Sequence, residues 1–425
     1  MAASRSGLDR IRSIVGGSAG NMVEVYDWFA YASFSLYFAK VFFPKGDQTA
    51  QLLSAAAVFA AGFLARPFGA WVMGLYADRA GRRRALMLSV SLMCLGSLII
   101  GLCPGAASIG VLAPTILVLA RMLQGASLGG EYGISAVYLS EMAGRERRGF
   151  WSSFQYVTLV AGQLMAVATL VVLQKVLSPE QLQSWGWRVP FFIGGALAVS
   201  VVFMRRGMEE TPSFAARGPE RARTLLLFTR HPRESLIVLG LTAGGTLAYY
   251  TFTTYIQKFL VNTSGFTKDT ATLITAAGLV LFMVSQPLMG ALSDKIGRRA
   301  LLIAFGVGGV LLTWPVMALL ARTHDAWAAF GLVALLMLVV ACYTSVNAVV
   351  KAELFPTEAR ALGVALPYAV ANALFGGTAE YVALWFKQAG HETWFYTYVT
   401  AIIALTLLVY VFMRETRTHS RILED

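Results

Sequence analysis

Long apolar runs separated by short polar segments recur along this 425-residue chain. A helix needs about 20 apolar residues to cross a membrane, and the runs do not alternate as the strands of a membrane barrel do. Because only helices and closed barrels satisfy the backbone in lipid, the pattern predicts an all-α polytopic membrane protein with about twelve spans. We expect these spans at 14–43, 50–77, 85–104, 112–141, 150–176, 187–205, 235–262, 269–292, 299–321, 326–350, 361–387 and 393–413.

The distribution of charge sets the expected orientation of these spans. Charged residues make up only 14% of the chain, against roughly 25% in soluble domains. With the N-terminus placed inside, the inner segments hold 25 of the 35 Lys and Arg residues, the outer loops hold 8, and Arg66 and Arg121 lie within spans. This asymmetry predicts that both termini are cytoplasmic. It also explains the net charge of +12 by topology and anionic lipid headgroups, and not by nucleic acid.

A loop signature, Gly-x-x-x-Asp-[Arg/Lys]-x-Gly-Arg-Arg, occurs at Gly74 and again at Gly290, 216 residues later. A second pair of loops repeats at an offset of 212 residues, from Glu141 to Glu353. Two matched loops indicate two pseudo-symmetric bundles of six helices, as in transporters that rock around a midplane site. The predicted bundles are 1–205 and 235–425, joined by a polar cytoplasmic linker at 206–234.

The residue types in these loops fit a latch that closes the cytoplasmic side. Glycine permits close helix contact, and aspartate can pair with arginine or with a helix N-terminus. A second glycine, Gly81 or Gly297, tolerates a positive φ in the turn. The residues expected to act in gating or in the latch are Gly74, Asp78, Gly81, Arg82, Glu131, Asp294, Gly297, Arg298, Glu353, Arg360 and Glu380.

The two loops are similar to those of the major facilitator superfamily, and further motifs resemble its metabolite:proton symporter family. These motifs are Gly20-Asn21-x-x-Glu24-x-Tyr26-Asp27, Arg66-Pro67-x-Gly69, Arg121-x-x-Gln124-Gly125-x-x-x-Gly129-Gly130-Glu131, Trp185-Gly186-Trp187-Arg188-x-Pro190-Phe191 and Phe355-Pro356-Thr357-x-x-Arg360. Longer runs, such as Phe375-Gly376-Gly377-Thr378-Ala379-Glu380, resemble the members that carry α-ketoglutarate. Val25 and Trp28 depart from the Trp and Phe usual at their positions.

This resemblance implies the fold, the activity and the location of the chain. The implied protein is a proton-coupled symporter of the bacterial inner membrane that imports α-ketoglutarate or a similar dicarboxylate by alternating access. It is implied to act as a monomer, to be driven by the proton gradient and to use no cofactor.

Ionisable residues at bilayer depth are costly and usually functional. Asp27 lies near the middle of the first span and Glu24 lies on the same face three residues earlier, so both are candidates for proton coupling. If the spans pack as in the superfamily, Asp27 can pair directly with Arg121, and its protonation would free Arg121 for an anionic substrate. Because arginine binds carboxylate through two parallel bonds, Arg66 and Arg121 are candidates for the two carboxylates of a dicarboxylate. The alternative is that these charges only fix the spans together.

Neutral polar residues within the spans are candidates for the remaining substrate contacts. Hydroxyl and amide groups bind keto and carboxylate oxygens, although they also make ordinary helix contacts. Lys258, at the outer end of the seventh span, is expected to extend to the membrane interface. The candidate neutral ligands are Tyr26, Gln163, Tyr249, Tyr250, Thr253, Asn347 and Asn372.

Several classes of function find no support in the sequence. It contains no Gly-x-x-x-x-Gly-Lys-[Ser/Thr] phosphate loop and no metalloprotease or nucleophile-elbow pattern. The three cysteines show no metal-ligand spacing. We therefore expect neither an enzyme nor a metal site. The alternatives within transport are citrate, shikimate or a betaine- or proline-type zwitterion, and the alternative from another class is a membrane sensor that does not transport.

Overall fold

The computed structural model describes residues 7–80, 82–129, 145–206 and 230–422, together with positions 136 and 140. All regular structure within these residues is helical. The long N-terminal helices are α1 (Gly7–Phe42), α2 (Gln48–Ala80), α3 (Arg82–Leu102), α5 (Leu112–Leu128), α7 (Arg148–Val176) and α9 (Val189–Arg206). The C-terminal helices are α12 (Pro232–Tyr250), η3 (Thr251–Tyr255), α13 (Ile256–Asn262), α14 (Lys268–Ile296), α15 (Arg298–Leu320), α16 (Ala326–Leu354), α17 (Thr357–Ala371), η4 (Asn372–Gly376), α18 (Ala379–Gln388) and α19 (Glu392–Phe412). Short helices are α4 (Ala106–Ile109), η1 (Arg145–Arg147), α8 (Pro179–Ser184) and η2 (Gly186–Arg188).

The predicted spans agree with these helices. Each of the twelve predicted ranges is helical over most of its described residues, and the differences are one or two residues at the ends and a short turn at 377–378 in the eleventh span. This agreement confirms the all-α prediction. In the described part of the chain, eight helices are long and apolar enough to cross a membrane by length and composition. The predicted linker is described only from residue 230 onward, so its boundaries stay a prediction.

Two of the spans contain a π-helical turn, which the apolar pattern does not reveal. In the seventh span η3 separates α12 from α13, and in the eleventh span η4 separates α17 from α18. The helix α12 packs against η4. Because π-helical turns in α-helices are rare and frequently lie at functional sites, these turns direct attention to the middle of the two spans.

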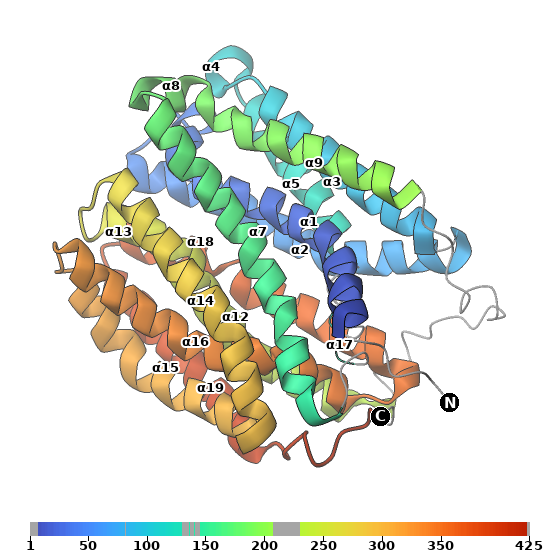
Figure 1. Cartoon of the computed structure of the whole chain (residues 1–425). Helices are drawn as coiled ribbons and strands as arrows, with labels where there is room; N and C mark the ends of the chain where they lie inside the picture. The colour runs from blue at the N-terminus through green and yellow to red at the C-terminus, as the bar shows by residue number, and fades with distance from the viewer. Residues whose placement is uncertain are drawn as a thin grey trace.

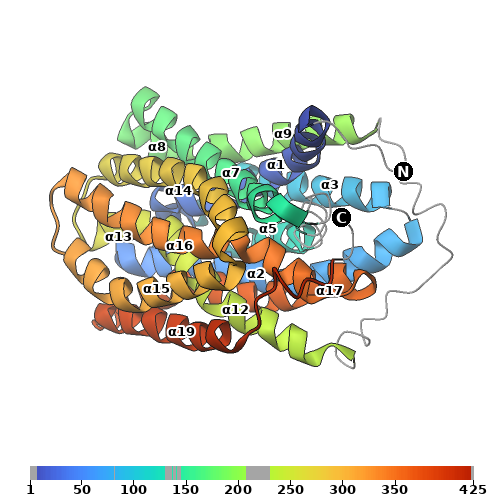
Figure 2. The ribbon, with the colours of Figure 1, turned by 60° about the horizontal axis from the view of Figure 1, so that its bottom comes forward.

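The helices α7 and α14 lie side by side where the N-terminal and C-terminal helices meet (Figures 1 and 2). On one side of this pair α1 packs against α7 and α3 packs against α9. On the other side α14 packs against α16, and α15 contacts both α16 and α19. A site between the two groups of helices can therefore receive residues from both parts of the sequence.

The helices α2 and α5 approach one another more closely than any side chain would allow. A Cβ atom placed on Gly125 would lie 1.8 Å from the carbonyl oxygen of Gly62. Small residues at helix contacts are the usual means of close approach in membranes. The contact brings Arg66 of α2 and Arg121 of α5 to the same region of the core.

Candidate functional site

Two arginines lie against one tryptophan ring in the core. The guanidinium carbon of Arg66 is 4.1 Å from the centroid of the Trp28 ring, and that of Arg121 is 3.9 Å from it. Arg66 also lies over the ring of Phe63, and Arg121 over the ring of Tyr31. The aromatic faces attract the cations and hold both guanidinium groups at the same indole. We call Trp28, Arg66 and Arg121 the arginine pair site.

The carboxylate of Asp27 belongs to the same region but does not touch Arg121 directly. Its Oδ2 atom accepts hydrogen bonds from Ser97 Oγ of α3 and, at 3.0 Å, from Gln124 Nε2 of α5. Gln124 Oε1 in turn accepts from Arg121 Nη1 at 2.8 Å. The expected direct pair of Asp27 and Arg121 is therefore wrong. The guanidinium lies on the Trp28 ring, and the amide of Gln124 fills the gap to the carboxylate.

The arginine pair site has unused hydrogen-bonding capacity. Among the described residues, no hydrogen-bond partner exists for Arg121 Nε and Nη2 or for Arg66 Nε, although these atoms are buried. A buried donor without an acceptor costs about 1–3 kcal/mol, and more when it is charged. Anionic groups bound at the two arginines would satisfy these donors, because carboxylate oxygens accept bonds from guanidinium groups.

Residues of the C-terminal helices approach the same site. The ring of Tyr250 packs edge-on against Phe63 at 5.1 Å between centroids, and its hydroxyl interacts with Arg66 and Asn372. Asn372 also accepts a 2.5 Å hydrogen bond from Thr246. The predicted candidates Arg66, Tyr250 and Asn372 are thus brought together across the interface between the two parts of the chain.

A second group of predicted candidates joins α7 to the seventh span. Gln163 Oε1 accepts from the hydroxyl of Tyr249 at 3.0 Å, and its Nε2 donates to the carbonyl of Thr253 at 3.0 Å. Asn347 Nδ2 donates to the hydroxyl of Tyr156, whose ring packs edge-on against Tyr249. These side chains bond one another, and the Thr253 hydroxyl bonds the Tyr249 carbonyl within its own helix.

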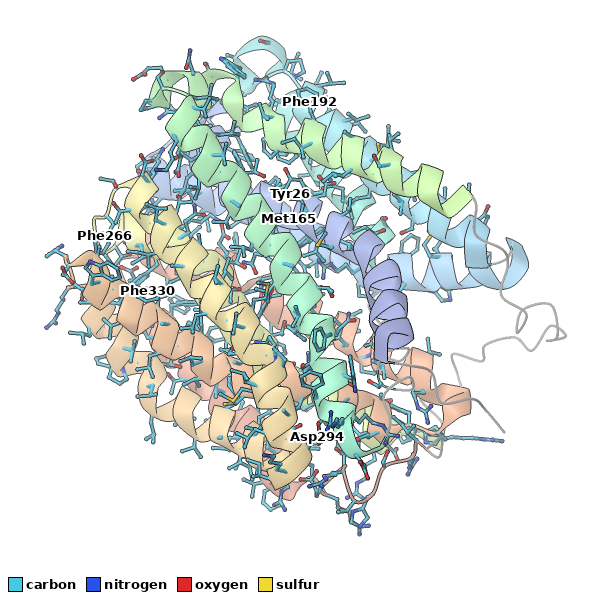
Figure 3. All side chains as sticks on the ribbon, viewed as in Figure 1. Tyr26, Met165, Phe192, Phe266, Asp294 and Phe330 are labelled. Atoms are coloured by element: carbon cyan, nitrogen blue, oxygen red, sulfur yellow. The ribbon has the colours of Figure 1, made fainter. Side chains whose placement is uncertain are left out.

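Two sequence expectations have a different outcome in the structure. Tyr26, expected as a substrate ligand, lies among the N-terminal helices (Figure 3). Its hydroxyl donates to the Pro190 carbonyl of α9 at 3.2 Å. Lys258, expected to extend to the interface, is fully buried. Its Nζ atom lies 2.8 Å from Glu380 Oε2, and the two residues follow the π-helical turns η3 and η4 in their spans. Glu24 is buried on α1 as its helical spacing predicts.

The Lys258–Glu380 pair yields a prediction about stability. Replacing Glu380 by Gln leaves a buried ammonium without its counter-ion, which typically costs about 3–5 kcal/mol. We expect E380Q to unfold at a clearly lower temperature in detergent, and the double variant K258M/E380M to recover most of the loss. Lys387→Met is the matched control, since its partner Glu392 lies 3.2 Å away in a partly exposed pair, and such pairs contribute about 0–1 kcal/mol. Equal losses for E380Q and K387M would contradict the prediction.

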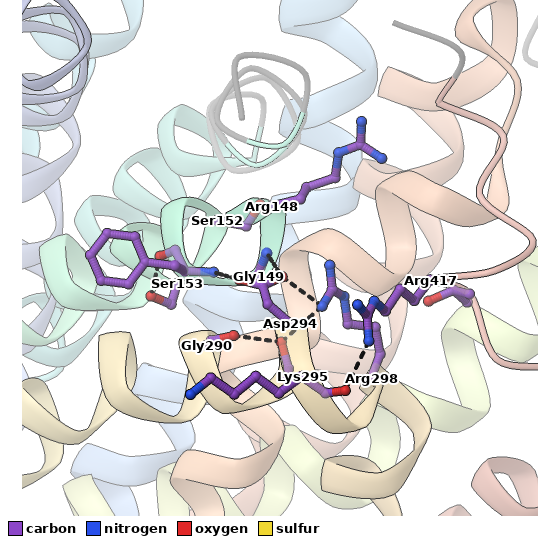
Figure 4. Close-up of polar contacts among 12 residues, drawn as sticks. Arg148, Gly149, Ser152, Ser153, Gly290, Asp294, Lys295, Arg298 and Arg417 are labelled. Atoms are coloured by element: carbon purple, nitrogen blue, oxygen red, sulfur yellow. Dashed lines mark hydrogen bonds and ion pairs between the residues drawn. The ribbon is translucent and has the colours of Figure 1, made fainter. Parts of the chain in front are cut away.

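The second signature loop forms a network of polar contacts between α7 and α14 (Figure 4). Asp294 accepts from the backbone N–H groups of Gly149 and Phe150, at 2.8 and 2.9 Å, which are free donors at the start of α7. Arg298 donates to Asp294 at 2.8 Å, and Glu353 lies 3.8 Å from Arg298. We call Asp294, Arg298 and Glu353, with the start of α7, the latch network. The aspartate at a helix N-terminus agrees with the sequence expectation.

Glycines shape this network at two positions. A Cβ atom on Gly290 would lie 2.6 Å from the carbonyl oxygen of Gly149, so α7 and α14 meet backbone to backbone. Gly297, in the turn between α14 and α15, has φ of 97°, which confirms the positive φ predicted from the signature. Gly81 and Glu131 lie outside the described residues. The structure also does not describe the side chains at Gly74, Asp78 and Arg82.

The C-terminal tail lies across the latch network, which the sequence does not reveal. Glu415 accepts from the backbone N–H groups of Arg298 and Arg299, each at 3.0 Å, and so caps the start of α15. Thr416 donates to Glu353 at 2.6 Å, and Arg360 donates to the backbone carbonyl of Arg421 at 3.0 Å. The two predicted latch residues Glu353 and Arg360 thus hold the tail as well.

The comparison with protein families decides what kind of protein carries this arrangement. A family model described as sugar (and other) transporter matches residues 14–233 and 216–423. The chain belongs to this transporter family. Its sequence is 51% identical to the alpha-ketoglutarate permease of Escherichia coli, over 94% of this chain and 93% of that protein. It is 34% identical to the citrate-proton symporter of Klebsiella pneumoniae, over 87% of this chain and 83% of that protein. It is 30% identical to the proline/betaine transporter of Salmonella typhimurium, over 95% and 83% respectively.

Solved structures of transporters have the same fold. The major facilitator superfamily proton:xylose symporter XylE bound to 6-bromo-6-deoxy-D-glucose matches with a TM-score of 0.77 and 19% identity, over 98% of both chains. A D-xylose-proton symporter matches with a TM-score of 0.73 and 21% identity, over 97% of this chain and 99% of that one. The major facilitator fold predicted from the sequence is confirmed. The chain is a multi-pass membrane transporter of a small metabolite and not an enzyme.

Three residues that shape the site are not among the sequence candidates. Trp28 was noted only as a departure from the family pattern, and Gln124 only as part of a motif. Ser97 is a small polar residue in an apolar span, where such residues commonly contact another helix. The pairing of Lys258 with Glu380 joins positions 122 residues apart. Gln124 lies three residues after Arg121 and so on the same helix face, which is the one sequence signal that could have identified Gln124.

Proposed function

We propose that this transporter imports α-ketoglutarate or a similar dicarboxylate together with protons. The observation that carries the proposal is the arginine pair site, where two guanidinium groups lie on one indole and keep buried donor atoms without partners. Two fixed positive charges match the two carboxylates of a dicarboxylate better than a zwitterion, which would leave its own cation beside an arginine. The identity of 51% to a permease for α-ketoglutarate supports this substrate.

The neighbouring side chains suggest how the rest of the substrate is held. Tyr250 and Asn372 approach Arg66 from the C-terminal helices, so they can contact the substrate from the other side. The adjoining polar side chains, which are joined by hydrogen bonds, are Tyr249, Gln163, Thr253 and Asn347. A ligand held by both groups of helices favours closure of the cavity around it, because its binding energy is gained fully only when they meet.

Asp27 is the proposed site of the coupled proton, with Glu24 as the second candidate. Asp27 is buried and is linked to Arg121 by Gln124, so a change in its charge acts on a group that binds the substrate. A protonated Asp27 leaves Arg121 without an opposing charge, and the substrate carboxylate supplies it. When the substrate leaves, the ionised carboxylate is favoured again and the proton departs.

One transport experiment tests the substrate and the coupling together. Purified protein in proteoliposomes receives labelled α-ketoglutarate under an imposed pH gradient, with the interior alkaline. We expect accumulation that a protonophore abolishes. An excess of unlabelled α-ketoglutarate or another dicarboxylate should compete strongly, whereas citrate, shikimate, proline and betaine should compete weakly. Strong competition by one of the latter group and none by dicarboxylates would reject the proposed substrate.

We further propose alternating access by two six-helix halves, 1–205 and 235–425, around this site. Both termini and the latch network then face the cytoplasm, as the charge distribution predicts, and the basic segments lie beside anionic lipid headgroups. The protein acts as a monomer, because the proposed path lies between the halves of one chain. The contact of Gly149 with Gly290 supports closure of the cytoplasmic side.

Replacing Gly290 by Ala tests the role of the latch network. The added Cβ would lie 2.6 Å from the Gly149 carbonyl oxygen and 2.8 Å from Ser153 Cβ, so α7 and α14 must separate. We expect the buried Ser153, changed to Cys in a background without the three native cysteines, to react with a membrane-impermeant maleimide about tenfold faster. This corresponds to a shift of about 1.4 kcal/mol toward the open state. Gly331→Ala is the matched control, because nothing lies within 4 Å of its added Cβ. Unchanged labelling in G290A would reject the latch.

A further inference from the structure

The side-chain amide of Gln124 lies between the carboxylate of Asp27 and the guanidinium of Arg121. Gln124 donates through Nε2 to Asp27 at 3.0 Å and to Ser97 Oγ at 2.8 Å, and it accepts through Oε1 from Arg121 at 2.8 Å. Because guanidinium groups only donate and ionised carboxylates only accept, this orientation of the amide satisfies both neighbours. If the amide were reversed, its Nε2 donor would face the N–H donors of Arg121.

We propose that Gln124 is a positioning residue that transmits the protonation of Asp27 to Arg121 by turning its amide. This inference rests on the proposed proton-coupled transport of a dicarboxylate and names the residue through which the coupling acts. Gln124 has no charge of its own and does not need to touch the substrate.

The proposed steps follow from donor and acceptor counts. Proton uptake changes Asp27 Oδ2 from an acceptor into an O–H donor. The amide of Gln124 then turns by about 180° about its last torsion, which has a roughly two-fold profile, and Oε1 accepts the new hydrogen bond. Nε2 now faces Arg121, so the guanidinium loses its acceptor and binds a substrate carboxylate instead. When the substrate leaves, Arg121 recovers Oε1, Nε2 returns to Asp27, and the proton is released.

Within the described part of the chain, the hydrogen bonds of the Asp27 carboxylate are all made by its Oδ2 atom. Its Oδ1 atom has no hydrogen-bond partner among the described residues and faces Gly194 of α9, where a Cβ would lie 2.3 Å away. The polar contacts that respond to protonation are therefore all at Oδ2. The charged or titratable groups around the carboxylate are Glu24 and Tyr26 of α1, Cys94 of α3 and Arg121 of α5.

Tyr26 and Cys94 do not offer a competing connection from Asp27 to Arg121. Tyr26 donates to the Pro190 carbonyl and Cys94 to the Gly195 carbonyl, so their hydrogens are used elsewhere. The helices α7 and α9 contribute Gly162 and Gly194 at this level of α1, without charge. Of these neighbours Arg121 is the cation, and its link to Asp27 runs through Gln124.

The pH dependence of substrate affinity tests the inference. Calorimetric titration of the purified full-length protein with α-ketoglutarate gives Kd at pH 5.5 and pH 8, where both substrate carboxylates are largely ionised. For the unaltered protein we expect tighter binding at pH 5.5 by about tenfold, a usual size for coupled sites. In Gln124→Met, which keeps the length but not the amide, binding should persist and the ratio should fall below about twofold. The matched control Gln286→Met, a buried amide of α14 bonded to Thr344, should keep the ratio.

The possible outcomes separate this inference from the proposed function. A tenfold ratio retained in Q124M, at any absolute affinity, would overturn the role of Gln124 while leaving proton coupling intact. If Q124M does not fold, Q124L provides the second test. It neither donates to Asp27 nor accepts from Arg121 and adds no titratable group, so a ratio below about twofold is expected. An unaltered protein without any pH dependence would reject the proposed coupling itself, and with it this inference.

Discussion

Replacement of Arg121 by Gln is expected to reduce uptake of α-ketoglutarate by at least about 100-fold. Arg121 is fully buried on Trp28, and its Nε and Nη2 atoms are the donors without partners that a carboxylate would occupy. Removal of one partner from a buried charged contact costs about 2–5 kcal/mol. The loss of the Arg121 guanidinium should appear as weaker substrate binding in a calorimetric titration and as reduced uptake in proteoliposomes.

Two further variants show whether this loss is specific. Arg121→Lys keeps the charge but not the forked donors, so we expect it to retain a small part of the activity, about a tenth or less. Arg188→Gln is the matched control, because Arg188 bonds the backbone carbonyls of Ser184 and Cys103 at the end of the helices. Near-normal uptake by R121Q would reject the arginine pair site as the binding site. Gel filtration of each variant separates a folding defect from a binding defect.

Replacement of Asp27 by Asn is expected to separate substrate movement from proton movement. Asn cannot take up and release the proton, but it fills the same volume and can still accept from Ser97 and Gln124. We expect exchange of labelled for unlabelled α-ketoglutarate across the membrane to continue. The pH gradient, however, should no longer drive accumulation, so the ratio of internal to external substrate should fall to about one.

The matched control for this variant is Asp47→Asn. Asp47 caps the start of α2 by accepting from the backbone of Ala50 at an exposed position, so gradient-driven accumulation should remain. If D27N accumulates substrate as the unaltered protein does, Asp27 does not carry the coupled proton. The same assay on Glu24→Gln then decides the second candidate.

The sequence predicted the fold well because its signal is local. Each span is a continuous apolar run, and the repeated signature places a glycine at Gly297 where the turn needs a positive φ. The candidate charges Asp27, Arg66 and Arg121 could be found as well, since an ionisable residue in an apolar run is conspicuous. The structure brings these three side chains into one region, as expected.

The connections within the site could not be predicted, because they depend on how the helices are rotated about their axes. Asp27 and Arg121 were expected to touch, but the close contact of α2 with α5 sets Arg121 on the Trp28 ring, and Gln124 takes the place beside the carboxylate. The hydroxyl of Tyr26 donates to the Pro190 carbonyl of α9 instead. The tail contacts of Glu415 had no periodic pattern to reveal them.

The π-helical turns η3 and η4 have a consequence for comparing related sequences. A π-helical turn holds more residues than an α-helical turn, and each residue turns an α-helix by about 100°. Each turn therefore accommodates an extra residue that would otherwise rotate the outer segment of its span, and Lys258 and Glu380 meet beyond both turns. A one-residue gap at either turn in an alignment would mark a relative whose span is a regular α-helix, and the residues beyond the gap would still be equivalent to those of this chain.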